Sequence, residues 1–364
     1  MVGAFTHFAA ALAAASTLLL AQPADAALRR RANLQPVMGG TGFPDPSVIR
    51  TGDGWHAFST NSAASGKQIN VPMAYTPDFK TWTYRGKTDA MPKLAPWVNA
   101  KSPKVWAPDV SQLPDGSFIM YYTASMAKTP ATHCLGYATS KNVEGPYVDN
   151  AKSAWICPTK QGGAIDPSGF LDQKTGKRYI VYKIDGNSIG HGGDCGNTVA
   201  PIVPTPIYLQ QVNAKNGHDL IGSPLELIRN GPADGPYVEA PSLTYMNGKY
   251  VLFFSSQCYA TPKYDVSYAI SNSLTGPYVK YGPLFVTGTL GFTAPGGLDI
   301  AVNGDHAVFH GYVNLTNGRS VSSPQGLIDA YSHTDRSRGS NYKGGRAMFT
   351  AILSLHGNTV TAHT

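Results

Sequence analysis

A short sequence pattern recurs along most of the chain and limits the folds that the chain can adopt. In its clearest copy, at residues 164–170, an acidic residue at a predicted strand start is followed by proline and a short apolar stretch. Related copies occur at residues 44–49, 107–110, 239–243 and 295–300, and the last of these is the most degraded. The spacing between copies is about the length of one four-stranded unit.

Each copy is followed by a second predicted strand that is rich in aromatic residues. These strands span residues 55–58, 118–122, 179–182, 250–254 and 306–309. A third predicted strand follows at residues 135–139, 207–210 and 266–270. Short strands and turns that repeat at a fixed period are typical of a radial array of small sheets. The sequence therefore predicts an all-β fold, a five-bladed β-propeller that forms a single domain.

Three carboxylates are expected to meet near the axis of this propeller. The first strand of every blade lies against the axis, so Asp45, Asp166 and Glu239 should converge there. Like charges that lie close together repel one another and push their pKa values apart, which is costly unless chemistry uses the difference. The pattern therefore indicates acid/base catalysis. A lone Asp-Pro would more often be a turn, but three matched copies favour the functional interpretation.

Composition narrows the class of partner. Glycine and proline account for 39 and 27 of the 364 residues, which argues against long helices. Charged residues make up only 14% of the chain, against roughly 25% in an average globular protein. The formal net charge of +7 could favour anionic polymers, but no cluster of Lys and Arg with interleaved aromatics follows Arg31. We therefore expect a polar surface suited to neutral ligands and no nucleic-acid partner.

The N-terminus is predicted to be a secretory signal peptide, residues 1–26. Residues 8–21 are apolar, and the Ala-Asp-Ala at residues 24–26 resembles a cleavage site. The apolar stretch is too short to span a bilayer, so we expect a secreted protein with no membrane association. Residues 27–39 would be an N-terminal tail and ring-closing segment, and residues 40–364 the propeller. The last strand pair, from residue 347, should close the ring with residues 35–38.

Four cysteines, an even count in a predicted secreted chain, indicate two disulfides. No pair has the spacing of a zinc site. Four cysteines allow three pairings. Of these we expect Cys134 with Cys157 between blades two and three, and Cys195 with Cys258 between two loops above the axis.

The chain resembles glycoside hydrolase family 43. The resemblance rests on the Pro-Asp-Pro at residues 44–46, the Ile-Asp-Pro at 165–167 and the Val-Glu-Ala-Pro at 238–241, which look like the three catalytic motifs of that family. The Trp-Ala-Pro-Asp at residues 106–109 matches its blade-two motif, and the Gly-Pro-Tyr turns at Gly145 and Gly276 are also typical of it. The likeness covers essentially the whole predicted mature chain.

The resemblance implies a role for each carboxylate. Asp45 would be the general base, Glu239 the general acid, and Asp166 the residue that orients the base and raises the pKa of the acid. Hydrolysis with inversion needs one carboxylate to deprotonate water and a second, protonated group to donate to the leaving oxygen. Asp109 and Asp299, interpreted as equivalents of these residues in blades two and five, are expected to be structural.

Three further residues are candidates for the site. Trp106 could stack on a sugar ring or pack in the core. Arg346 resembles a blade-five arginine that several family members point at substrate hydroxyls, although it could also be a surface arginine at a strand start. Many family members hold an axial calcium through a histidine beside a glycine. Here residues 296–298 contain no histidine, and His310 is the nearest substitute, or else a core histidine.

These observations together predict a secreted, inverting, exo-acting α-L-arabinofuranosidase that acts on α-1,5-arabinan or arabino-oligosaccharides. A β-xylosidase or an endo-arabinanase of the same family is the alternative, because fold and mechanism are shared more widely than substrate. A non-catalytic sugar-binding propeller is an alternative of another class. The expected partners are plant cell-wall arabinan and arabinoxylan, and we expect a monomer that requires no cofactor. The polar loop at residues 183–197 should set the preferred substrate length.

Overall fold

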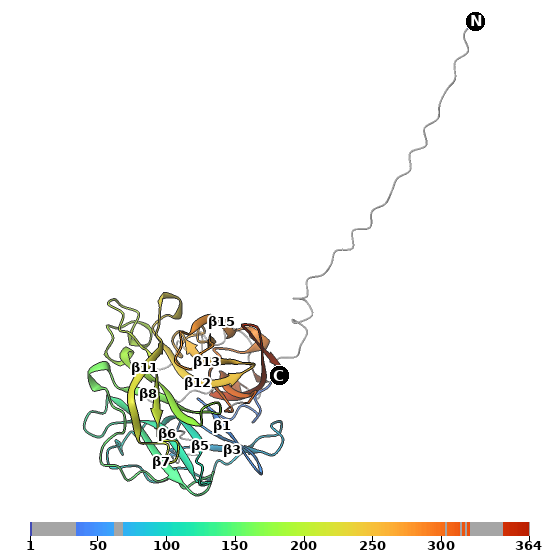
Figure 1. The fold of residues 1–364 in the computed structure, drawn as a ribbon. Helices are drawn as coiled ribbons and strands as arrows, with labels where there is room; N and C mark the ends of the chain where they lie inside the picture. Colours follow the sequence, from blue (N-terminus) through green and yellow to red (C-terminus); the bar gives the residue numbers. More distant parts are fainter. Residues whose placement is uncertain are drawn as a thin grey trace. The chain divides into compact units, whose positions relative to one another are not determined.

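Five antiparallel sheets make up the propeller in the computed structural model (Figure 1). The structure describes Met1 and residues 34–61, 68–302, 304–313, 315–316, 319–320 and 345–363. The predicted signal peptide after Met1, and the tail up to residue 33, lie outside the described residues. The predicted all-β, five-bladed, single-domain fold is confirmed. In the part of the chain that the structure describes, no helix is long and apolar enough to cross a membrane.

The blades follow one another along the chain. Blade one contains β1 (Ser47–Thr51), β2 (Gly54–Phe58), β3 (Met73–Thr76) and β4 (Thr83–Tyr84). Blade two contains β5 (Trp106–Gln112), β6 (Phe118–Ser125) and β7 (His133–Ser140). Blade three contains β8 (Ala164–Asp172), β9 (Lys177–Ile184), β10 (Ile207–Val212) and β11 (Leu220–Ile228).

The last two blades each contain four strands. Blade four contains β12 (Val238–Met246), β13 (Lys249–Ser256), β14 (Val266–Ser271) and β15 (Val279–Phe285). Blade five contains β16 (Gly296–Ile300), β17 (His306–Tyr312), β20 (Arg346–His356) and β21 (Thr359–His363). A separate two-stranded pair is formed by β18 (Leu315–Thr316) and β19 (Arg319–Ser320). Each recurring motif thus opens one blade.

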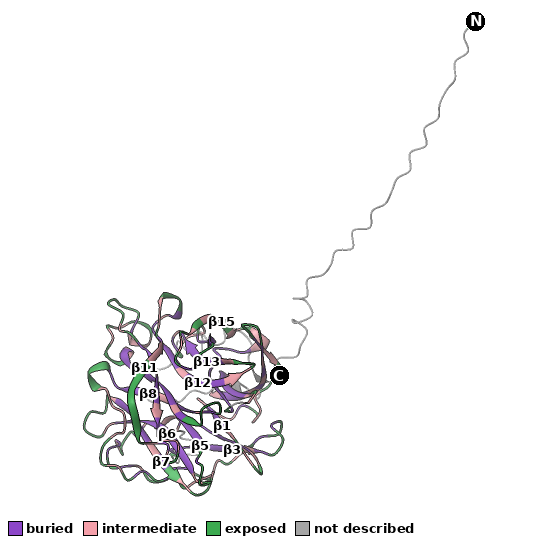
Figure 2. Ribbon diagram, viewed as in Figure 1, coloured by how far each residue is buried: buried purple, intermediate pink, exposed green. Residues whose placement is uncertain are grey.

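Burial falls from the inner strands of a blade to its outer edge. Strand β6 is buried at every position, and β13 at all but its first, because neighbouring blades cover both faces of these strands. This is why the second strands are continuously aromatic and apolar rather than alternating. Strand β11, at the outer edge of blade three, is exposed over its first six residues (Figure 2).

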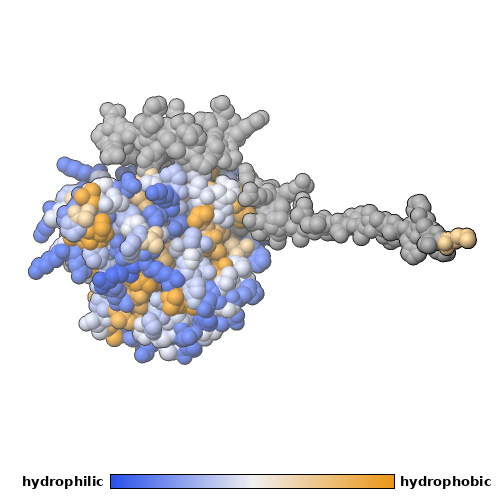
Figure 3. Space-filling view, turned by 90° about the horizontal axis from the view of Figure 1, so that it is seen from above, coloured by the Kyte–Doolittle hydropathy of each residue, from blue (hydrophilic) through white to orange (hydrophobic). Residues whose placement is uncertain are grey.

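The hydrophobic core is divided among the interfaces between blades. Five large clusters of buried side chains each combine residues from two neighbouring blades, so every interface, including that between blades five and one, has its own core. Representative members are Phe58 and Met120, Ile119 and Ile180, Leu209 and Leu252, Phe253 and Phe309, and Val308 and Val48. On the face seen from above, apolar residues form small groups separated by hydrophilic ones (Figure 3).

The segment before blade one bonds to blade five. The backbone N–H of Val37 donates to the carbonyl of Met348 at 3.0 Å, and that of Phe43 donates to the carbonyl of Arg346 at 2.7 Å. Both acceptors lie at the start of β20, which also pairs with β17 and β21. Backbone bonds therefore join the two ends of the described propeller.

Both predicted disulfides are confirmed. Cys134 on β7 is bonded to Cys157, which lies between blades two and three. Cys195 and Cys258 join a loop of blade three to a loop of blade four. All four cysteines of the chain are therefore used.

Candidate active site

One residue near the start of each inner strand has a left-handed backbone. These axial residues have φ between 41° and 58°, and in four blades proline follows: Asp45, Ala107, Asp166, Ala240 and Gly297. Such a φ is strained for any residue with a side chain, and strain of this kind collects at functional sites. The pairing of inner and second strands shifts register at the same place in blades two to five. The motif is therefore a bulge that turns the chain at the axis.

The N–H of each axial residue donates to a side chain of the preceding blade. The pairs, taken in chain order, are Asp45 N to His310 Nδ1 at 3.1 Å, Ala107 N to Thr60 Oγ1 at 2.9 Å, Asp166 N to Thr123 Oγ1 at 3.0 Å, Ala240 N to Asp166 Oδ2 at 3.0 Å, and Gly297 N to Ser255 Oγ at 2.9 Å. These bonds link every blade to its neighbour around the axis and satisfy N–H groups that the bulges leave without a strand partner.

Asp45 is held by groups that favour its ionised form. Arg346 Nη1 donates to Oδ1 at 2.8 Å and Thr60 Oγ1 donates to Oδ2 at 2.6 Å. Burial alone would raise the pKa of Asp45, but Arg346 and the bond from Thr60 lower it overall. Asp45 is therefore an anion near neutral pH, as a general base must be.

Glu239 lies on β12, one residue before the axial position. Tyr264 Oη donates to its Oε1 at 2.8 Å, and Lys183 Nζ donates to its Oε2 at 2.9 Å. Only 8% of Glu239 is exposed. Both oxygens of the predicted general acid therefore have a buried donor.

Asp166 occupies the same register as Asp45 but has different surroundings. Burial first, and then the nearby Glu239, raise the pKa of Asp166 to about 8, although Lys183 opposes the shift. Asp166 therefore carries a proton near neutral pH. We expected Asp166 to raise the pKa of the acid, whereas in the structure the raised pKa is that of Asp166 itself.

Asp109 and Asp299 do not occupy the equivalent positions that the sequence suggested. The bulges place them two residues after the axial residues Ala107 and Gly297, so the predicted equivalence with Asp45 and Asp166 is wrong. Asp109 accepts the N–H of Gly169 from blade three. Asp299 accepts the N–H of Val48 at 2.8 Å and the hydroxyl of Ser242 at 2.7 Å, from blades one and four.

Four carboxylates line one cavity on the axis: those of Asp45, Asp109, Asp166 and Asp299. Burial raises the pKa of Asp109, and burial together with the charge of Asp109 raises the pKa of Asp299. Asp45 and Asp166 are axial residues, whereas Asp109 and Asp299 each lie two residues after one. Asp109 and Asp299 accept bonds from neighbouring blades, whereas Asp45 carries the charge that a base requires.

Trp106 and Arg346 were the candidate substrate-binding residues. Trp106 is half-buried, so it is not a fully buried core residue, and its ring stacks on His133 with ring centroids 4.3 Å apart. The guanidinium of Arg346 is bonded to Asp45 and lies 5.6 Å from the ring centroid of Tyr259. Arg346 therefore donates its hydrogen bond to Asp45, the proposed base.

His310 was the candidate ligand for a calcium ion. Burial first, and then Arg346, lower its pKa to about 3, so its ring is neutral. Its Nε2 has no hydrogen-bond partner among the described residues. Calcium prefers six to eight oxygen ligands, and within the described ranges no three His, Cys, Asp or Glu residues gather to hold a metal. His310 can supply one nitrogen, which does not amount to a calcium site built by the protein.

Lys183, Tyr264 and Thr60 contact the carboxylates but were not among the residues that we identified from the sequence. Lys183 was assigned to a polar loop, whereas it is the penultimate residue of β9 and is fully buried. A signal was available, because a lysine inside an apolar strand is almost never buried without a charged partner.

Known proteins resemble this chain in sequence and in fold. The model of the family described as glycosyl hydrolases family 43 matches residues 34–330. The extracellular endo-α-(1→5)-L-arabinanase 1 of Bacillus subtilis is 29% identical over 86% of this chain and 92% of its own length. The extracellular endo-α-(1→5)-L-arabinanase 2 of the same organism is 27% identical, and the match spans 67% of this chain and about half, 51%, of that relative.

A crystal structure of a thermostable family-43 glycoside hydrolase superposes with a TM-score of 0.66. It is 21% identical, and the match covers 91% of this chain and 96% of the other. At this identity the likeness establishes the fold.

Proposed function

The chain belongs to glycosyl hydrolase family 43, and from this premise we propose that it cleaves internal α-1,5 linkages of arabinan. It is an inverting glycoside hydrolase that acts on O-glycosyl bonds. The observation that carries the choice of substrate is the match with an extracellular endo-arabinanase over 86% of this chain and 92% of that relative. It supports the endo-acting alternative better than the exo-acting arabinofuranosidase that the sequence led us to expect.

Asp45 and Glu239 divide the chemistry in this proposal. A water molecule loses a proton to Asp45, and its oxygen forms the new bond to the anomeric carbon from the face opposite the leaving group. The bond to the leaving oxygen breaks as Glu239 donates a proton to that oxygen. The bond from Arg346 supports the role of Asp45, because it favours the anion.

Asp166 contributes to this reaction through its neighbours. Its Oδ2 accepts the N–H of Ala240, the residue next to Glu239, and so orients the strand that carries the acid. Burial first, and then the charge of Glu239, raise the pKa of Asp166, so Asp166 itself holds a proton near neutral pH.

We propose no cofactor for the reaction, and a cation beside His310 would have a structural role only. Secretion is part of the proposal. It is supported by the two disulfides, which persist in oxidising compartments, and by the extracellular relatives. The substrate would then be plant arabinan, met outside the cell as a polymer.

The test follows the products of linear α-1,5-arabinan from the first minutes of reaction. We expect oligosaccharides of intermediate length to appear before arabinose, and proton NMR to show the β-anomer first. Arabinose alone at early times would favour the exo-acting alternative. Faster hydrolysis of β-1,4-xylo-oligosaccharides would identify xylo-oligosaccharides, and not arabinan, as the substrate. Binding without hydrolysis would point to a non-catalytic sugar-binding propeller.

A further inference from the structure

The position that faces each axial motif, on the second strand or just after its end, carries a hydrogen-bond acceptor in four blades. Residues at this position pair with, or lie opposite, the residue before the axial one. They are Thr60, Thr123, Ser255 and His310, and each accepts the axial N–H of the next blade.

In blade three the corresponding residue is Lys183, which pairs with Ile165. A lysine ammonium has three donor hydrogens and no acceptor, so it cannot take the N–H of Ala240. That N–H goes instead to Asp166 Oδ2. The ammonium of Lys183 donates to Glu239 Oε2. Because blade three has a lysine where the other blades have an acceptor, Asp166 accepts the N–H of Ala240 and Glu239 accepts a hydrogen bond from Lys183.

Lys183 is enclosed by groups that stabilise a cation. Its side chain is 1% exposed, and Nζ lies 2.9 Å from Glu239 and 3.7 Å from Asp185. Nζ also lies 4.1 Å from the ring centroid of Tyr237. Burial would lower the pKa of Lys183, but Glu239, Asp185 and Asp166 raise it overall. Lys183 is therefore charged at the pH at which the site operates.

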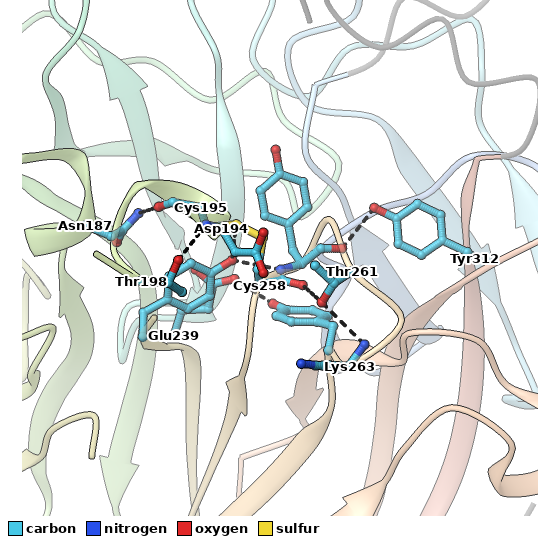
Figure 4. Close-up of a disulfide and its surroundings, with 12 residues drawn as sticks. Asn187, Asp194, Cys195, Thr198, Glu239, Cys258, Thr261, Lys263 and Tyr312 are labelled. Atoms are coloured by element: carbon cyan, nitrogen blue, oxygen red, sulfur yellow. Dashed lines mark hydrogen bonds between the residues drawn. A yellow bond between two sulfur atoms is a disulfide. The ribbon is translucent and has the colours of Figure 1, made fainter. Parts of the chain in front are cut away.

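Tyr237 in turn is fixed by the Cys195–Cys258 bridge. Its hydroxyl lies 3.1 Å from Cys195 Sγ and accepts the N–H of Tyr259 at 2.8 Å. The same loop is braced where the hydroxyl of Tyr312 donates to the carbonyl of Tyr259 (Figure 4). The ring of Tyr237, which lies over Lys183, is therefore held by loops that the Cys195–Cys258 disulfide joins.

We infer that Lys183 is a positioning residue for Glu239, which it holds in place and stabilises as an anion once the proton has passed to the leaving oxygen. The inference rests on the proposed role of Glu239 as the acid. Proton donation leaves a carboxylate in a buried site, where an unpaired charge is costly. The nearby ammonium offsets that charge and so favours the transfer. Asp166 and Asp185 also face Lys183, and Tyr264 donates to Glu239 from the other side.

The informative variant is Lys183→Thr, because threonine occupies this position in blades one and two and restores an acceptor for the next axial N–H. Arg178→Met is the matched control. Arg178 is a buried cation on the same strand, and it bonds to the carbonyl of Gln112 away from Glu239. The control tests for the general effect of removing a buried charge from β9.

The chain has only three glutamates, Glu144, Glu226 and Glu239, so a carboxyl NMR titration of protein labelled with ¹³C-glutamate can follow Glu239 directly. The Glu239→Gln variant assigns the signal. We expect its midpoint to move to higher pH in Lys183→Thr, by about one to three pH units, and to stay in place in Arg178→Met. An unchanged midpoint in Lys183→Thr overturns the inference.

Kinetics supply the second readout. In Lys183→Thr we expect kcat/KM for α-1,5-arabinan to fall by about 100-fold or more, and for an aryl arabinofuranoside with a good leaving group by less than about 10-fold. Equal losses on both substrates would indicate a merely structural role. A wild-type chain that cleaves neither substrate would overturn the proposed function, whereas the NMR titration still decides whether Lys183 acts on Glu239.

Discussion

Arg346 Nη1 lies 2.8 Å from Asp45 Oδ1, although the two residues are separated by 301 positions of sequence. Asp45 precedes the first strand of blade one and Arg346 begins β20 of blade five. The proposed base therefore receives its counter-charge across the junction where the propeller closes.

Removing this counter-charge should change the pH dependence of catalysis. Arg346→Gln takes a cation from Asp45 and so raises the pKa of the carboxyl. Because the base must be ionised, the acidic limb of kcat/KM should move to higher pH, by about one to three pH units. Arg346→Lys retains the charge and should move the limb less. A limb that stays in place in Arg346→Gln would show that Arg346 does not tune the base.

The two catalytic carboxylates should be separable by leaving group. Glu239→Gln should lose at least about 100-fold in kcat on arabinan but much less on activated aryl glycosides, which need little proton donation. Asp45→Asn should lose both activities, because water must be activated whatever the leaving group. Steady-state kinetics on the two substrates checks this, and a uniform loss in Glu239→Gln would argue against its role as the acid.

Asp109 and Asp299 should make the folded state sensitive to pH. The pKa values of Asp109 and Asp299 are raised in the folded protein, whereas an unfolded aspartate titrates near 3.8. Above about pH 4 the unfolded chain has released protons that the folded chain retains, so stability should fall as pH rises. Asp299→Asn removes one of these groups and should flatten the dependence.

Urea midpoints at pH 5 and pH 8 measure this difference. Asp219→Asn, which changes an aspartate whose side chain is 61% exposed, is the control and should follow the wild type. If Asp299→Asn followed the wild type as well, Asp299 would not be a source of the pH dependence.

The two disulfides should differ in what they contribute. Cys195 and Cys258 are 63 positions apart, and Cys134 and Cys157 are 23 apart. Loop-closure entropy then gives about 4 kcal/mol for the longer loop and about 3 kcal/mol for the shorter one. Replacing each pair by serine and comparing the free energies of unfolding tests the order. Loss of the Cys195–Cys258 disulfide should also affect KM for arabinan, because this disulfide holds the loop that contacts Tyr237. Loss of the Cys134–Cys157 disulfide should not.

Much of the fold could be predicted because it repeats. The recurring motif, degraded in blade five, and the aromatic strand after it mark every blade, and both depend on local sequence. The disulfide pairs could also be chosen correctly, although spacing alone left three pairings open.

The position of each carboxylate within its motif could not be predicted from the spacing. A bulge at the axial residue lets Asp109 fall two places after Ala107, while Asp166 is itself axial. The letters Asp and Pro occur in both motifs, and only the backbone distinguishes them. Lys183 was missed for a related reason. Its equivalence to Thr60 and Thr123 follows from strand register, and these residues have no chemical likeness to a lysine.

The division of the core among interfaces affects how the molecule can come apart. In a closed ring every blade is supported on two sides, whereas an open row has two end blades that are each supported on one. The bonds from Val37 and Phe43 to β20 add to the hydrophobic core and to the Asp45–Arg346 bond that join blades five and one. Cutting the chain beyond Phe43 would separate blade one from these backbone bonds and weaken that junction, so unfolding should start there. A protease acting there would reduce the cooperativity of the whole molecule while removing few of its contacts.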